Sequence, residues 1–173
     1  MNVPSLRFLT ILLIGLTIFG TTHAEDAWPE YRSIEGGFAV SFPGAPKLTN
    51  QTAPDGESIH SVVVDLDKTA FLVLYTDYGT GTFAGGDPAL ALDQVRDRLV
   101  GDQKTQLRIE RNFTFKSRPA RELVIDDAHG STQIYRLYIV GDRLYQVICG
   151  GPKGFETSPD AQRFENSFRL TAQ

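Results

Sequence analysis

The stretch that decides the fold is RPARELVIDDAHGSTQIYRLYIVGDRLYQVICGG, residues 118–151. It contains three apolar runs, at 120–128, 131–140 and 143–149, which are separated only by AHG and GD. A further run at 106–116 precedes it across the short segment KSRP. Because connections this short join antiparallel neighbours, we expect four strands in an antiparallel meander.

The segments before this meander have the same strand character. EYRSIEGGFAVSFPGAP (30–46) reads as a short strand, a turn at 35–37, and a second strand with alternating apolar residues. Strict alternation indicates a strand with one buried face. The segment 57–78 predicts two further strands, and its second run, AFLVLY, is apolar at successive positions. A strand of that kind is covered on both sides.

Two segments predict helices. The first spans about 88–103, with Asp87 as the N-cap, Pro88 at the first position and one apolar face formed by Ala89, Leu92, Val95 and Leu99. The second begins after Ser158, and its apolar residues Ala161, Phe164 and Phe168 recur at three and four residues. The closing FRL (168–170) predicts a last short strand. The predicted fold class is α+β: a mainly antiparallel sheet of about seven strands with helices packed on it, as in an α/β/α-like sandwich.

Three quoted stretches together resemble one group of proteins. They are EYRSIEGGFAVSFPGAP, YRLYIVGDRLYQVICGG and the closing AQRFENSFRL, with the long helix between them. This pattern is similar to the PsbP-like superfamily of α/β sandwiches, which includes DcrB-like bacterial envelope proteins and Mog-type Ran-binding proteins. The resemblance covers nearly all of residues 28–171. It implies a small, secreted or lumenal, cofactor-free accessory or binding module, and it transfers no functional residue to this chain.

The beginning of the chain reads as a leader. MNVPSLRFLTILLIGLTIFGTTHA has one positive charge, an apolar run and small residues at positions 22 and 24. We predict a signal peptide over residues 1–24 and a single domain over residues 25–173. The protein would then be secreted or periplasmic, without a stable membrane span after cleavage. The alternative is an uncleaved membrane anchor, which the short apolar run disfavours.

Charge and cysteine content narrow the classes of function. The formal net charge is −4, and the arginines are interleaved with carboxylates, so the chain lacks the clustered basic face that nucleic acid requires. Cys149 is the single cysteine, so no intrachain disulfide forms. It lies in a strand-like run, where a thiol is usually a small buried hydrophobe.

The loop DYGTGTFAGGDP (77–88) is the one segment with features beyond packing. Its glycines begin a G-x-G pattern, but the spacing to Gly85 is one residue too long for a dinucleotide fingerprint. Asp87 also stands where a phosphate would meet the helix amino terminus, and a carboxylate there repels phosphate. We therefore expect an exposed flexible loop whose Tyr78 and Phe83 contact a peptide, a lipid or another subunit. A mobile loop with no partner is the alternative.

The sequence gives little support for a catalytic or metal-binding site. Neither the turn acids Asp126 and Asp127 with His129, nor Asp65 with Asp67, supply enough ligands for a metal site. We assign no catalytic residue, metal or cofactor. The sequence predicts a non-catalytic binding or accessory module with an envelope or extracellular protein partner. The alternative is a small extracytoplasmic enzyme with a site assembled from scattered residues, such as His60, Glu122, Tyr135 and Arg136.

Overall fold

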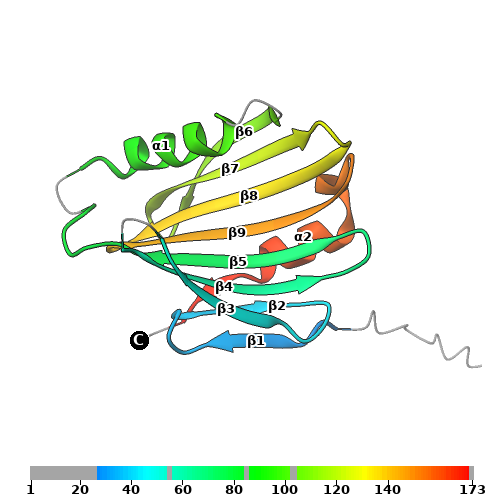
Figure 1. The fold of residues 1–173 in the computed structure, drawn as a ribbon, viewed down its shortest axis with the longest axis horizontal. Helices are drawn as coiled ribbons and strands as arrows, with labels where there is room; N and C mark the ends of the chain where they lie inside the picture. The colour runs from blue at the N-terminus through cyan, green and yellow to red at the C-terminus, as the bar shows by residue number, and fades with distance from the viewer. Residues whose placement is uncertain (1–26, 54–55, 84–85, 102–104, 172–173) are drawn as a thin grey trace, which may run out of the picture.

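A seven-stranded antiparallel sheet forms the largest part of the molecule (Figure 1). The computed structural model describes residues 27–53, 56–83, 86–101 and 105–171. Along the sheet the strand order is β3-β4-β5-β9-β8-β7-β6. The strands are β3 (Lys47–Thr52), β4 (Ser58–Asp65), β5 (Ala70–Asp77), β6 (Thr105–Phe115), β7 (Arg118–Asp127), β8 (Ser131–Val140) and β9 (Arg143–Pro152). The predicted meander is thus confirmed, since β6 to β9 pair in sequence order.

A second, three-stranded sheet corrects the expectation of a single sheet. It has the order β1-β2-β10, with β1 (Glu30–Ser33), β2 (Phe38–Ser41) and β10 (Arg169–Leu170) all antiparallel. Phe38, Ala39 and Val40 of its central strand are fully buried. A strand buried at successive positions is covered on both sides. The first hairpin therefore packs on the larger sheet with one face instead of extending it at an edge.

Strand β3 was not predicted from the sequence. KLTNQT has no apolar alternation, and all six of its residues are exposed. It pairs with β4 alone, from Lys47 opposite Val63 to Thr52 opposite Ser58. The backbone ladder to β4 thus makes this segment a strand, because burial of its side chains contributes little.

Both predicted helices are present, with the predicted caps. In α1 (Pro88–Val100), the Asp87 carboxylate accepts a hydrogen bond of 2.8 Å from the N–H of Ala89. In α2 (Pro159–Ser167), the Ser158 hydroxyl accepts one of 3.1 Å from the N–H of Ala161. A short 3-10 helix, η1 (Phe155–Thr157), precedes α2. Among the described residues, no helix is long and apolar enough to cross a membrane. The predicted signal peptide lies outside the described residues.

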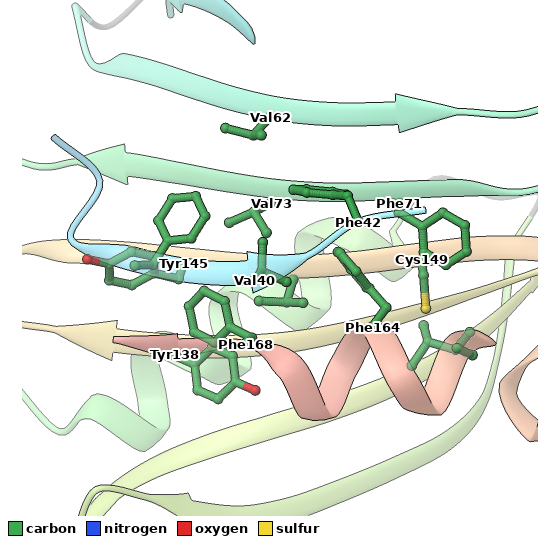
Figure 2. Close-up of a cluster of buried hydrophobic side chains, with 14 of the residues drawn as sticks. Val40, Phe42, Val62, Phe71, Val73, Tyr138, Tyr145, Cys149, Phe164 and Phe168 are labelled. Carbon is green, nitrogen blue, oxygen red and sulfur yellow. The ribbon is translucent and has the colours of Figure 1, made fainter. Parts of the chain in front are cut away.

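The buried apolar side chains form two clusters, because successive residues of a strand point to opposite faces of the sheet. One cluster includes Leu92 of α1 and the strand residues Leu123 and Leu137. The other includes Phe164 of α2 and Phe168, which follows that helix. Figure 2 shows this second cluster between α2 and the strands, with Val40, Phe42, Val62, Phe71, Val73, Tyr138, Tyr145 and Cys149 around the two phenylalanines. Phe164 and Phe168 are therefore core residues, as the helical spacing predicted.

Candidate binding site

Several hollows surround a single arginine, Arg118, at one end of the larger sheet. Arg118 begins β7, directly after the two-residue turn that follows β6. Three neighbouring hollows, of about 580, 300 and 270 Å³, all include Arg118 in their walls. The walls also contain apolar side chains, among them Phe115, Tyr138, Ile139 and Leu170. This end thus combines concave apolar surface with a cation.

The guanidinium of Arg118 is exposed and has no ion-pair or hydrogen-bond partner among the described residues. The nearby Lys116 ammonium is also exposed, and it donates one long hydrogen bond, 3.4 Å, to the carbonyl of Leu170. Arg143, which also lies at this end, is already ion-paired with Asp77. Arg118 is therefore the positive charge at this end that is free to bind an anionic group.

The turn before Arg118 has an unusual backbone. Lys116 and Ser117 have φ of 47° and 64°, and they are the non-glycine residues with positive φ in the described chain. Two consecutive left-handed residues match the twist of a tight hairpin, but asparagine and glycine usually occupy such positions. A left-handed conformation costs about 1–2 kcal/mol for each ordinary residue. Strained residues of this kind concentrate at functional sites, where the surrounding structure maintains them.

Arg143 contributes to the framework of this end. Its guanidinium makes two bonds to the Asp77 carboxylate, of 2.5 and 2.7 Å, and donates to the Glu35 carbonyl at 3.0 Å. It also lies 4.8 Å from the centre of the Tyr75 ring. The hydrogen bond to Asp77 raises the pKa of Arg143 above its ordinary value. The charge of Arg143 is thus already paired with Asp77. Its bond to the Glu35 carbonyl links the β1–β2 turn to β5 and β9.

The structure corrects the expected exposure of Tyr78 and Phe83. Both side chains are half-buried, they contact each other edge to face at 5.2 Å between ring centres, and they pack against the cluster that includes Leu92. Asp142 holds the loop through bonds of 2.9 Å from Gly81 N–H and 3.3 Å from Phe83 N–H. The part of the loop that the structure describes is therefore tied to the β8–β9 turn.

The same two aromatic residues do lie at the hollowed end. Tyr78 lines one of the hollows that include Arg118, and Phe83 lines another. Their binding role stays a prediction, but the fold brings them to the same surface as Arg118. Sequence reasoning missed Arg118 itself. The only signal was KSRP, which reads as an ordinary polar turn.

The four scattered residues of the enzyme alternative do not form one site. His60 on β4 stacks on the Tyr75 ring at 4.5 Å and contacts Asn50. Tyr135 points to the opposite face of β8 from its neighbour Arg136, since it packs near the α1 cluster. Only Glu122 and Arg136 meet, at 3.0 Å.

That pair belongs to a largely buried charge network under α2. Arg136 lies between two carboxylates, Glu122 at 3.0 Å and Glu165 at 2.9 Å. Burial raises the pKa of Glu165 to about 7, although the Arg136 charge opposes this effect. Cys149 is buried beside Glu165, and burial raises the pKa of its thiol. The thiol is therefore a packed, protonated group, as the sequence predicted. No sequence signal marked Glu165.

The acidic turns have local hydrogen-bonding roles. Asp127 accepts bonds from the N–H groups of His129, at 2.8 Å, and Ser131, at 2.9 Å. These backbone bonds, with that of Ser131 first, hold the pKa of Asp127 below its usual range. Asp126 accepts from the Thr132 hydroxyl and pairs with Arg108. Within the described ranges, no group of three or more His, Cys, Asp or Glu side chains is arranged to hold a metal ion.

A further hollow of about 510 Å³ lies at the opposite end of the sheet, where the β4–β5 turn meets the start of β8. Its walls contain Asp65, Asp67 and Lys68 together with Leu72 and Ile148. Its charges are mixed and mainly acidic. None of the residues in its walls belongs to the hollows around Arg118.

Comparison with known proteins places this chain among structures with a PsbP-like fold, which confirms the resemblance in the sequence. One similar structure is the solution structure of cyanobacterial PsbP (CyanoP) from Synechocystis sp. PCC 6803. It has 12% sequence identity and a TM-score of 0.52, over 83% of this chain and 92% of that chain. At this identity the likeness shows the fold alone.

A crystal structure from Bacteroides thetaiotaomicron VPI-5482 also matches, with 10% identity and a TM-score of 0.38 over 83% of this chain and 48% of that chain. No protein-family model and no curated protein matches the sequence.

Proposed function

We propose that this protein is a secreted or periplasmic, non-catalytic binding module that recognises an acidic segment of an envelope or extracellular protein at the Arg118 end. The observation that carries the proposal is the Arg118 guanidinium, which has no partner in the described part of the chain and lies in the shared wall of three hollows. The finer features of the proposal, export and the sandwich arrangement of the layers, rest on the leader-like residues 1–24 and on the PsbP-like resemblance.

The chemistry of the surface supports an acidic and partly apolar ligand. An arginine guanidinium binds a carboxylate through two parallel hydrogen bonds, and this geometry gives specificity as well as affinity. Arg118 is adjacent to apolar walls that include Tyr138 and Ile139, while Tyr78 and Phe83 contribute aromatic surface nearby. Arginine and aromatic residues are enriched among the residues that dominate binding energy in protein interfaces.

The shape of this end also supports a polypeptide ligand. The hollows adjoin one another around the β6–β7 turn, so an extended segment could occupy several of them at once. The loop held by Asp142 and the strained turn at Lys116 and Ser117 fix the walls before the ligand arrives. A preformed surface loses less conformational entropy on binding.

The proposal is tested by affinity capture from an extract of the cell envelope. The purified protein is compared with Arg118→Glu and with the control Arg98→Glu. Arg98 is an exposed arginine at the end of α1 without an ion pair to any described residue. The captured partner should be lost with Arg118→Glu and kept with Arg98→Glu, and the double change Tyr78→Ala and Phe83→Ala should weaken capture. A set of captured proteins that is the same for all variants would contradict the proposal.

A further inference from the structure

Strand β3 leaves one edge of the larger sheet unpaired. It is the first strand in the sheet order, and β4 is its neighbour. All six residues are exposed, and no backbone hydrogen bond joins them to any described segment outside the sheet ladder. Unpaired strand edges are templates for the addition of another strand.

The register identifies the backbone groups that point outward. The N–H of Ala53 donates to the carbonyl of Glu57 at 2.8 Å, which places this pair at a hydrogen-bonded position of the β3–β4 ladder. In an antiparallel ladder such positions alternate along each strand. Thr49 and Gln51 therefore face β4 with their backbone groups, while Leu48, Asn50 and Thr52 direct theirs away from the sheet.

The opposite edge of the sheet is protected, and β3 is not. Strand β6 carries a register irregularity between Leu107 and Ile109, and it has the charged residues Arg108, Glu110 and Arg111. Bulges and charges are the usual devices that prevent strand addition. From Leu48 to Thr52, β3 has no charge and no irregularity in its register. Leu48 is 61% exposed and is the large apolar residue on this edge.

We propose that β3 pairs with β3 of a second copy of this chain, antiparallel about a two-fold axis at Asn50. In this register Leu48 lies opposite the second copy's Thr52, and Asn50 lies opposite the second copy's Asn50. Each opposed pair exchanges two backbone hydrogen bonds, because the outward groups of all three residues have the same parity. The larger sheets of the two copies become one continuous sheet.

The composition of β3 favours a second copy as the occupant. A two-fold interface brings the same surface patch of both chains together, so any charge near the axis would meet its own copy. The outward-facing residues are uncharged, and the single charged residue, Lys47, lies opposite the second copy's Ala53 at the end of the ladder. The pairing therefore has no like charges opposed, and it covers two Leu48 side chains.

The test is sedimentation velocity of the purified protein from about 1 µM to about 1 mM, a range that spans moderate and weak self-association. Wild-type protein should sediment as a dimer at the upper end. Asn50→Pro removes an outward N–H and should raise the dissociation constant at least about tenfold, with little change in melting temperature. Gln51→Pro is the matched control, because it removes an N–H that faces β4 and should destabilise the monomer.

A second measurement keeps the test independent of variant folding. In wild-type protein, hydrogen exchange at Leu48, Asn50 and Thr52 should be slower at high than at low protein concentration. A protein that stays monomeric throughout the range would overturn the proposal. A dimer whose dissociation constant is unchanged by Asn50→Pro would place the interface elsewhere, and a foreign peptide bound to β3 of a monomer would replace the second copy as the occupant.

Discussion

Arg121 and Glu122 are adjacent on β7, and their side chains connect the sheet to different helices. Arg121, only 4% exposed, pairs with Asp93 of α1. Glu122 pairs with Arg136 at 3.0 Å, and Arg136 pairs with Glu165 of α2 at 2.9 Å. Because successive residues of a strand point to opposite faces, one dipeptide contributes an ion pair to each side of the sheet. The positions of α1 and α2 both depend on β7.

Phe168→Ala should lower the free energy of unfolding by roughly 3–5 kcal/mol, through lost burial and the cavity that it leaves. The ring is 6% exposed and stacks on Tyr138 at 5.3 Å between centres. A denaturant titration measures the loss. Phe83→Ala is the control, and it should cost clearly less because that ring is half-buried. Equal losses would show that Phe83 is as deeply packed as Phe168.

The stability of the protein should fall as the pH rises from about 5 to about 8, in part because of Glu165. Burial raises the pKa of this carboxyl from 4.5 to about 7 in the folded protein. Its contribution is fully present below the unfolded pKa, and it is lost as the pH rises through the folded pKa. The expected change is on the order of 3 kcal/mol.

Glu165→Gln isolates this effect, since the amide does not titrate. Denaturant titrations of both proteins at several pH values give the difference in unfolding free energy, in which other titrating groups cancel. This difference should vary with pH in favour of the wild-type protein at low pH. A difference that is constant from about pH 5 to about pH 8 would mean that Glu165 titrates at an ordinary value.

Ser117→Gly should stabilise the fold by about 0.5–1 kcal/mol, because glycine adopts the left-handed conformation without the cost borne by serine. The φ of Ser117 is 64°. Thermal denaturation measures the gain. Thr114→Gly, at an exposed position within β6, is the matched control and should destabilise by a similar amount. A loss of stability in both variants would argue against strain in the turn.

Export should remove residues 1–24, so that the released protein begins at Glu25. The apolar run of the leader is short, and the charged pair Glu25 and Asp26 follows the cleavage site at once. Intact mass of the protein recovered from the periplasm or medium measures the cut. Ala24→Arg should block it, since signal peptidase requires a small residue there. A product that still begins at Met1 would identify a membrane anchor.

The fold was predictable where sequence periodicity reports local burial. The strands from Thr105 to Pro152 and both helix caps follow from alternation, short turns and capping residues. Two features were not predictable, and the reasons differ. Strand β3 has no alternation to detect, and the short segment Arg169–Leu170 gives no sign that it pairs with β2.

The candidate site was predictable only in part. The glycine-rich loop singled out Tyr78 and Phe83, which line two of the hollows that include Arg118. It did not predict that Asp142 holds this loop, since the two segments are far apart in the sequence. Arg118 gave no signal because an arginine after a turn is usually an ordinary surface residue. The hollows around Arg118 form only when the fold brings together the β6–β7 turn, the β8–β9 turn and the loop that follows β5.

The pairing of β10 with β2 has a consequence for how the protein matures. Arg169 lies opposite Ala39, and the hydroxyl of Ser167 accepts a hydrogen bond from the N–H of Ser41, which is 126 residues earlier. Contacts between such distant segments form late, because the intervening chain must first be brought together. A nascent chain therefore cannot form this pairing until residues 167–170 have been synthesised. Until then Phe38 and Ala39 of the buried strand β2 are without their β10 partners, so the smaller sheet is incomplete.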